Sequence, residues 1–205
     1  MEVLIGVTFK DFALLAADKM AAFSVISMKN DENKLYKLSD TLMMAVCGEP
    51  GDTKQFAEFI EKNIQLYKMR NGFELPPKSA ATFIQRNMAD YLRSRSPYTC
   101  NILLAGYDTE NGPELYLIDY LATMTKLPYG IHGYGSMFAL GFFDRYYRYD
   151  MSVEEALDLL KRCINEIQKR LIVSLPVFKV SIIHKDHIKE MDDVKVDTKA
   201  LGLSE

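Results

Sequence analysis

Cys47 and His132 are the pair of residues that could do covalent chemistry. A histidine that takes the proton from a cysteine thiol creates a nucleophile for acyl transfer. Cys47, however, ends the apolar run 42–47, and reactive cysteines need a polar, partly exposed setting. We therefore interpret Cys47, Cys100 and Cys163 as buried thiols of a protein in a reducing compartment, because they are widely spaced and form no C-x-x-C pair.

A second candidate site is the short segment that contains His184, Asp186 and His187, whose side chains could bind a metal. Tetrahedral zinc needs four donors, and no fourth ligand follows at a standard spacing. We therefore predict a solvated turn here, and we expect neither a metal nor another cofactor.

Two clusters of basic and aromatic residues are candidates for protein contact. The first lies on a predicted helix, where its side chains either form a solvated face or contact another subunit, and both readings stay open. The second has the density of tyrosines and arginines that is typical of interface hot spots. The clusters are Lys78, Arg86, Arg93 and Arg95, and then Arg145, Tyr146, Tyr147, Arg148 and Tyr149. The interface candidates that we select are Arg93, Arg95, Arg145, Tyr146 and Tyr147.

The bulk composition is that of an ordinary globular protein. Hydrophobic residues make up 48% and charged residues 26% of the 205 positions, with a formal net charge of -3. This charge does not favour nucleic acid or an anionic membrane as a partner. No apolar run approaches the roughly 20 residues that span a bilayer. Residues 1–6 lack the basic start of a secretory leader, so we expect a protein of the cytoplasm and nucleus.

The first fifty residues have the pattern of strands. Val3, Ile5 and Val7 alternate with other positions, which predicts a half-buried strand. Runs that are apolar throughout predict strands covered on both faces. These runs are residues 12–17 and 42–47. Turns are expected at residues 9–12 and 108–113, and further strands at residues 101–107, 114–120 and 177–183.

Helical periodicity appears in two pairs of segments. The first pair has Phe56, Ile60, Ile64 and Tyr67 before Asn71-Gly72, and then Ala80, Ile84, Met88 and Tyr91 after Pro76-Pro77. The second pair is a short helix after Gly135 and a long one that begins at Ser152, where Glu155 completes a capping box. The predicted buried face of the long helix is Val153, Ala156, Leu160, Ile164 and Ile167.

The order of elements is strands, two helices, strands, two helices and a strand. This order predicts an α+β fold in which two sheets pack face to face and a helix pair covers each outer face. No linker or internal repeat divides the chain. We therefore expect one domain over residues 1–190 and a loose polar tail over residues 191–205.

Several segments, each a weak signal alone, occur in a recognisable order along essentially the whole chain. They are Gly6, Leu15-Ala16-Ala17-Asp18, Asn33-Lys34-Leu35, Cys47-Gly48-Glu49-Pro50-Gly51-Asp52, Gly133-Tyr134-Gly135-Ser136, Asp144-Arg145-Tyr146-Tyr147 and the helix over residues 152–170. Together they resemble the proteasome beta-subunit family. Residues 65–72, 92–98 and 103–108 are especially similar to the beta type-2 branch, which takes the fourth position of the eukaryotic beta ring.

The resemblance implies a fold and a set of partners. The fold would be the four-layer alpha-beta-beta-alpha sandwich of the N-terminal-nucleophile hydrolases. The partners would be other beta subunits in a seven-member ring, subunits of the alpha ring, and the opposite beta ring with a symmetry copy of this chain. Neither a nucleic acid nor a membrane is expected as a partner.

The resemblance also locates a site. Active family members use a threonine that begins the mature chain as the nucleophile and its own amine as the base. Asp18 matches the family's aspartate, Lys34 its lysine and Gly48 the glycine whose N–H stabilises the oxyanion. In the same register Glu2 takes the place of the threonine. We therefore expect no catalytic residue, and we interpret Asp18 and Lys34 as a structural ion pair at relic positions.

Further departures point the same way. Tyr134 replaces the serine of a Gly-Ser-Gly loop, and Leu171 replaces an aspartate although Ser174 keeps the accompanying serine. No glycine is followed by threonine, the bond that active members cleave, and Met1 directly precedes Glu2, so we expect no propeptide.

The leading hypothesis is a non-catalytic structural subunit of the 20S core. Such a subunit would support assembly and chamber formation for ubiquitin-dependent and other intracellular protein degradation, without peptidase activity of its own. Two alternatives remain at this point, an active N-terminal-nucleophile hydrolase and a free-standing binding module.

Overall fold

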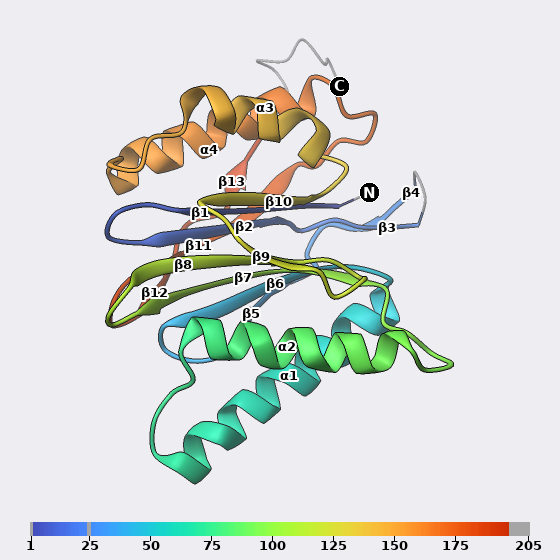
Figure 1. Ribbon diagram of the computed structural model, residues 1–205. Coiled ribbons are helices and arrows are strands. Elements are labelled where there is room, and N and C mark those ends of the chain that lie inside the picture. Colours follow the sequence, from blue (N-terminus) through green and yellow to red (C-terminus); the bar gives the residue numbers. More distant parts are fainter. Residues whose placement is uncertain (1, 24–25, 197–205) are drawn as a thin grey trace.

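The chain folds into four layers, helices on sheet on sheet on helices, in the computed structural model, which describes residues 2–23 and 26–196 (Figure 1). We name the two large sheets the β1 sheet and the β6 sheet. The β1 sheet has the order β10-β1-β2-β11-β12, with β13 also paired to β11. Its strands are β1 (Val3–Thr8), β2 (Ala13–Asp18), β10 (Tyr129–Gly133), β11 (Val177–Ile183), β12 (Ile188–Glu190) and β13 (Val194–Lys195).

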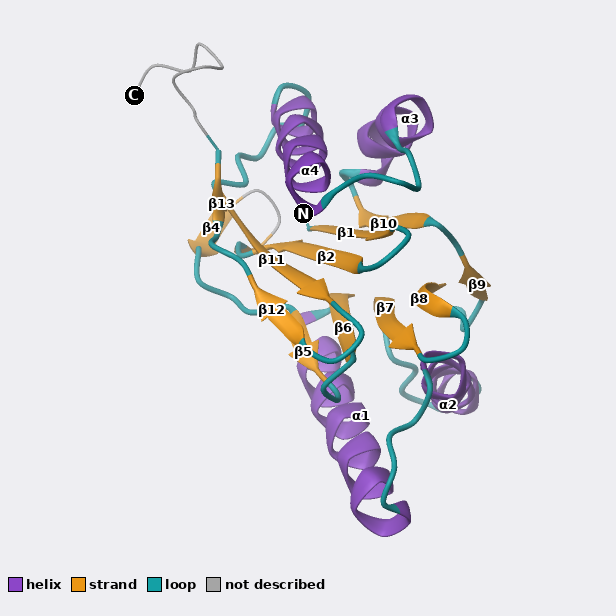
Figure 2. Cartoon of the chain, turned by 90° about the vertical axis from the view of Figure 1, so that its left-hand side faces the viewer, coloured by secondary structure: helices purple, strands orange, loops and turns teal. Residues whose placement is uncertain are grey.

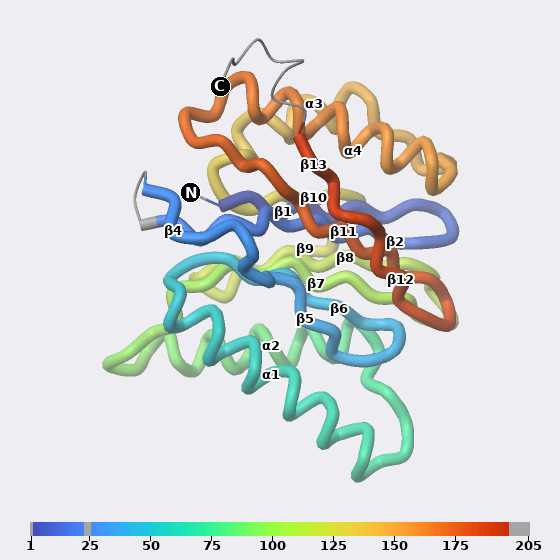
Figure 3. Tube along the Cα trace, turned by 180° about the vertical axis from the view of Figure 1, so that it is seen from behind, coloured from blue at the N-terminus to red at the C-terminus, as the bar shows by residue number. Residues whose placement is uncertain are grey.

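The β6 sheet has the order β5-β6-β7-β8-β9, and all its neighbouring strands are antiparallel. Its strands are β5 (Leu35–Lys37), β6 (Leu42–Gly48), β7 (Cys100–Asp108), β8 (Gly112–Ile118) and β9 (Met124–Lys126). A separate hairpin pairs β3 (Ala21–Phe23) with β4 (Ile26–Lys29), and Figure 3 shows it at the same edge as the N-terminus.

Two helix pairs cover the outer faces of the sheets. Figure 2 shows α3 and α4 over the β1 sheet and α1 and α2 on the far side of the β6 sheet. Their bounds are α1 (Pro50–Asn71), α2 (Pro77–Leu92), α3 (Ser136–Tyr146) and α4 (Val153–Gln168). No helix in the described part of the chain has the length and apolar character needed to cross a membrane.

Three apolar clusters hold the layers together. One lies between the β1 sheet and the α3–α4 pair, a second between the β6 sheet and the α1–α2 pair, and a third between the two sheets. Both sheets are therefore buried on both faces. The predicted α+β sandwich of four layers is confirmed.

The strand predictions hold, with one correction. β2 and β6 are buried along their lengths, as their apolar runs predict. β1 was predicted to be half-buried, which is wrong, because all six of its residues are buried. The alternation of apolar residues suggested one exposed face, but the face that carries Gly6 packs against the opposite sheet. A Cβ at Gly6 would lie 2.7 Å from a methyl of Leu115 in β8, so the glycine lets the sheets approach closely.

The first helix pair follows its sequence signals. α1 ends where predicted, since Gly72 adopts a left-handed φ of 78° and its N–H donates to the Lys68 carbonyl. Ala80, Ile84 and Met88 form the buried stripe of α2. Tyr91 was expected on that stripe but is exposed, because its ring packs against Tyr98 beyond the helix end instead.

The second helix pair also matches, including the predicted cap of α4. The Glu155 N–H donates to the Ser152 hydroxyl, and the Ser152 N–H donates to the Glu155 carboxylate, which is the capping box. Ala156, Leu160, Ile164 and Ile167 are buried as expected, whereas Val153 is half-buried because it lies at the first turn.

The chain after residue 183 differs from the prediction of a final strand and a loose tail. β12 and β13 both pair with β11, and Val194 of β13 is buried. Part of the predicted tail, Val194–Lys195, therefore extends the β1 sheet, and Val194 supplies an apolar contact to the core. The rest of the predicted tail, residues 197–205, lies outside the described residues.

Candidate functional site

Asp18 and Lys34 form a buried ion pair at the ends of two strands. Asp18 ends β2 and is 0% exposed, and the side chain of Lys34, just before β5, is 6% exposed. The Lys34 Nζ lies 2.7 Å from Asp18 Oδ2 and also donates to the Met20 carbonyl at 2.9 Å. Asp18 accepts two backbone N–H bonds as well, from Val3 at 2.7 Å and Met20 at 3.1 Å. Every buried charge here therefore has partners.

Glu2 joins this pair to the end of β6. Its Oε1 lies 3.1 Å from the Lys34 Nζ, and its Oε2 accepts the Gly48 N–H at 2.8 Å. Gly48 has a φ of 141°, and a Cβ there would lie 2.2 Å from the Thr99 carbonyl oxygen, so only glycine fits. The structure thus brings Glu2, Asp18, Lys34 and Gly48 together, as the register predicts.

Burial and charge act in opposite directions in this cluster. Burial raises the pKa of Asp18, because the loss of water outweighs the stabilising hydrogen bonds from Lys34 and the Val3 N–H. Burial opposes the charge of Lys34, but the attraction of Asp18 and Glu2 outweighs it and raises the pKa of that ammonium. Lys34 therefore stays cationic at neutral pH, held between two carboxylates.

The loop after β10 closes over Glu2. Gly133 has a φ of 83°, and a Cβ there would lie 1.9 Å from the Glu2 carbonyl oxygen. The same carbonyl accepts the Tyr134 N–H at 3.1 Å. The Tyr134 side chain is 55% exposed, so the phenol stands in solvent beside the cluster. Leu171 is half-buried and Ser174 is exposed.

The Cys47–His132 pair is not a reactive centre. Cys47 is buried in the layer between the sheets, where burial raises the pKa of its thiol far above the usual value. Burial likewise raises the pKa of Cys100 and of Cys163 to about 12. Burial lowers the pKa of His132, whose Nε2 has no hydrogen-bond partner within the described residues. The three thiols are buried, as predicted.

His184 and His187 lie in the turn between β11 and β12, where the His184 N–H donates to the His187 carbonyl and the two rings stack at 5.1 Å. Within residues 2–23 and 26–196, no group of three histidine, cysteine or acidic side chains is arranged to hold a metal ion.

The five interface candidates divide into two kinds. Arg93 and Arg95 are exposed at the end of α2, and Arg145 and Tyr146 are exposed on α3. Tyr147 instead lies within the fold, because its hydroxyl donates to the Thr8 carbonyl at 2.8 Å and its ring packs on Phe9 and Tyr129. The density of tyrosines and arginines in this segment does not distinguish a tyrosine that packs inside the fold, such as Tyr147, from one that lies on the surface.

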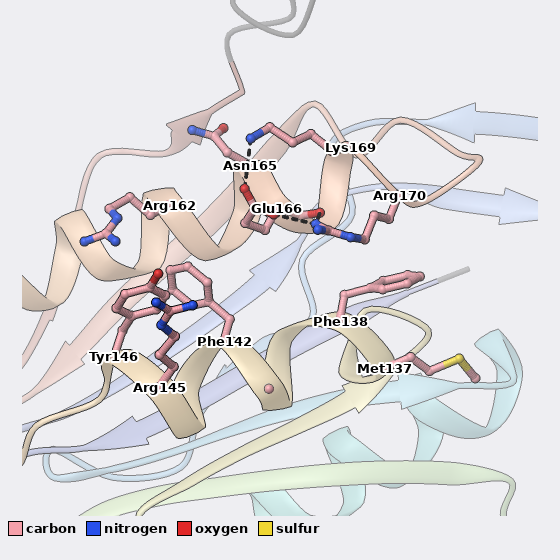
Figure 4. Close-up of a pocket in the computed structure, with 11 residues that line it drawn as sticks. Met137, Phe138, Phe142, Arg145, Tyr146, Arg162, Asn165, Glu166, Lys169 and Arg170 are labelled. Atoms are coloured by element: carbon pink, nitrogen blue, oxygen red, sulfur yellow. Dashed lines mark hydrogen bonds and ion pairs between the residues drawn. The ribbon is translucent and has the colours of Figure 1, made fainter.

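Arg145 and Tyr146 line a groove of about 630 Å³ between α3 and α4 (Figure 4). Arg162 of α4 extends over the Tyr146 ring at 4.8 Å, a cation–π contact. Further along α4, Glu166 is paired with Lys169 at 2.8 Å and with Arg170. We did not predict Arg162, Lys169 and Arg170 as surface residues of this groove, although their spacing along α4 and just after its end was a usable signal.

The four layers and the Asp18–Lys34–Gly48 arrangement at one end of the sheets define the class, which is the N-terminal-nucleophile hydrolase fold. The family model described as "Proteasome subunit" matches residues 2–183. The chain belongs to the proteasome beta-subunit family.

Relatives from plants and yeast agree with this placement. The chain is 47% identical over 190 residues to proteasome subunit beta type-2-A of Arabidopsis thaliana, which covers 93% of each chain. It is 42% identical over 194 residues to proteasome subunit beta type-4 of Saccharomyces cerevisiae, covering 94% of this chain and 98% of the relative. Proteasome subunit beta type-2 of Oryza sativa subsp. japonica is 47% identical over 190 residues, or 93% and 89% of the two chains.

Proposed function

We propose that this chain is a non-catalytic structural subunit of the 20S core, which completes the beta ring and helps to enclose the chamber. The observation that carries the proposal is the position of the Glu2 carboxylate between the Lys34 ammonium and the Gly48 N–H. Acyl transfer by this fold needs a hydroxyl or thiol nucleophile at that point, and an ionised carboxylate there only accepts hydrogen bonds.

The surroundings of Glu2 support the same proposal. The backbone carbonyl of Glu2 is bonded to the Tyr134 N–H, so the residue is held by backbone as well as by its side chain. Residues Asp18 and Lys34 are fully engaged with one another and with backbone groups. The relic positions thus have a structural role that needs no catalysis, as an ion pair at the ends of two strands.

The α3–α4 face supports a role in assembly, with a symmetry copy of this chain as the partner. A second groove of about 630 Å³ continues the first along α4. The second groove is mixed in charge, because its acidic side chains Glu154, Glu155 and Asp158 lie beside Arg145, Arg148 and Arg162. The first groove is mainly basic, because Lys169 and Arg170 follow the end of α4 and Glu166 is its one acidic side chain. Two such faces in antiparallel, two-fold contact would bring the acidic side chains of one second groove toward the basic first groove of the other copy.

The remaining partners follow from membership of the family and are part of the proposal. We place the chain in a seven-member ring between two other beta subunits, in contact with the alpha ring, in the cytoplasm and nucleus. A C-terminally tagged copy should therefore purify in a particle of about 700 kDa, the mass of roughly thirty chains of 23.4 kDa. A mass of one or two chains would overturn the assembly proposal.

The test of the non-catalytic role is the activity of particles that carry Lys34→Ala. We expect each peptidase activity, measured per assembled particle, to match that of the unaltered particle, because no nucleophile depends on this lysine. The chain isolated from the particle should not begin with Thr, Ser or Cys. Loss of one specific activity at normal assembly, or a chain that begins with Thr, Ser or Cys, would contradict the proposal.

Tyr146→Ala tests the assembly surface. Tyr146 is exposed on the groove, so its truncation should lower the particle yield on a native gel without unfolding the chain. An unchanged yield would rule out this tyrosine as a contact.

A further inference from the structure

The Glu2 carboxylate uses its two oxygens on two different donors. Oε1 pairs with the Lys34 Nζ at 3.1 Å and Oε2 accepts the Gly48 N–H at 2.8 Å. Glu2 precedes β1, while Gly48 ends β6, so the contact joins strand ends of the two large sheets. One side chain thus fills a small site whose donors belong to other parts of the fold.

The donors keep their positions without help from Glu2. An ammonium has three N–H donors, and two of those of Lys34 are engaged by Asp18 and the Met20 carbonyl, which directs the third toward Glu2. The Gly48 backbone is fixed by pairing with Cys100 and by the close approach of the Thr99 carbonyl. Removal of the Glu2 side chain would therefore leave a cation and an amide N–H that still converge.

Of the three charged side chains that the structure describes in this cluster, Glu2 is the one that reaches water. The side chains of Asp18 and Lys34 are almost fully buried, whereas that of Glu2 is 28% exposed. A charge-assisted bond to a carboxylate is stronger in such a partly dehydrated position than on an open surface. A carboxylate that replaced that of Glu2 would reach both donors from solvent.

We propose that Lys34 and Gly48 form a carboxylate-binding site and that Glu2 is its built-in ligand. The ligand class is a monocarboxylate, and the competitor that Glu2 excludes is the free C-terminus of a peptide. The choice of a peptide as the competitor rests on the proposed location in a chamber that contains cleaved chains. The binding site itself rests only on the contacts of this chain.

The experiment measures formate binding to the full chain and to Glu2→Ala. Formate is titrated at constant ionic strength against chloride, while the thermal midpoint and the amide proton shift of Gly48 are followed. We expect Glu2→Ala to show a saturable rise in midpoint and a downfield shift of the Gly48 proton, and the unaltered chain to show neither. Absence of any formate-specific response in folded Glu2→Ala would overturn the proposal.

Two further variants control for general effects. Glu190→Ala removes a carboxylate from Lys179, 3.3 Å away on the surface, and should show no saturable response to formate. Glu2→Gln keeps the shape of the side chain, so it should bind no formate but move the Gly48 proton upfield as the acceptor loses its charge. If Glu2→Ala does not fold, an unchanged amide proton shift of Gly48 in Glu2→Gln would contradict the proposal. None of these results depends on particle assembly, so the two proposals fail separately.

Discussion

The buried cluster at the sheet ends and the exposed cluster in the α3–α4 groove are built from the same groups in opposite proportion. In the first, one cation, Lys34, lies between the two carboxylates of Asp18 and Glu2. In the second, one carboxylate, Glu166, lies between the cations of Lys169 and Arg170. The side chain of Lys34 is 6% exposed, whereas that of Lys169 is 53% exposed.

This difference in burial decides what each cluster can do. Water cannot replace a partner at Lys34 or Asp18, so their pairing is part of the folded structure and is costly to break. Water screens every charge around Glu166, so those ion pairs contribute little to stability and can exchange for the charges of a partner. The first cluster is suited to fixing the fold, and the second to recognition.

The largest change in the free energy of unfolding is expected from Lys34→Ala. This change leaves the buried Asp18 carboxylate without its cation, although the Val3 and Met20 N–H bonds remain. The free energy of unfolding should fall by about 3–5 kcal/mol, the cost of breaking a buried pair. Denaturant titration of the full chain measures it, and a loss below about 1 kcal/mol would mean that water reaches Asp18.

The next largest change in stability is expected when one glycine from each region is replaced by alanine. Gly48→Ala would place a Cβ 2.2 Å from the Thr99 carbonyl oxygen in a left-handed backbone, so we expect a loss of about 2–3 kcal/mol. Gly141 lines the α3–α4 groove within a helix, and a Cβ there meets nothing within 4 Å. Gly141→Ala should therefore stabilise the chain by about 0.5–1 kcal/mol. Equal effects in denaturant titrations would remove the distinction between the two regions.

Local signals in the sequence predicted most elements of the fold. The capping box at Ser152 and the stop at Gly72 are encoded by neighbouring residues, so they could be read directly. The burial of β1 and the pairing of β13 depend on contacts far along the chain, such as Leu115 against Gly6. Such contacts leave no periodic trace in a short segment.

The candidate site was predictable in its members but not in its bonds. Asp18, Lys34 and Gly48 followed from one register, which placed Glu2 beside them. The use of both Glu2 oxygens on separate donors depends on how the start of β1 lies against the end of β6, and no local pattern specifies that arrangement. The inward direction of Tyr147 was missed for the same reason, because its acceptor, the Thr8 carbonyl, belongs to a distant strand.

A smaller contribution, to the pH dependence of the free energy of unfolding, should come from His132, a buried histidine at the interface of the two sheets. Burial lowers its pKa below 6.5 in the folded chain, so the unfolded chain takes up the proton first as the pH falls. Stability from this group is complete above pH 6.5 and is lost below it, by at most about 1.4 kcal/mol for each pH unit. The difference in unfolding free energy between the unaltered chain and His132→Gln, measured from pH 7.5 to about 5, should follow this slope.

The control for that measurement is His187→Gln, because His187 is exposed in the turn before β12. It removes one histidine without touching the core. If His132→Gln and His187→Gln changed the pH dependence by the same amount, the effect would not come from burial.

The smallest effect is expected from Lys169→Ala in the isolated chain. Arg170 remains paired with Glu166, and water screens the group, so the free energy of unfolding should change by less than about 1 kcal/mol. Added salt should reduce the change further, since it screens exposed charges. The same substitution also tests recognition, because a partner that covers the groove would remove the water. A loss of particle stability well beyond the loss in the isolated chain would indicate that Glu166 and its cations are buried on assembly, whereas equal small losses would leave the groove as an ordinary solvated surface.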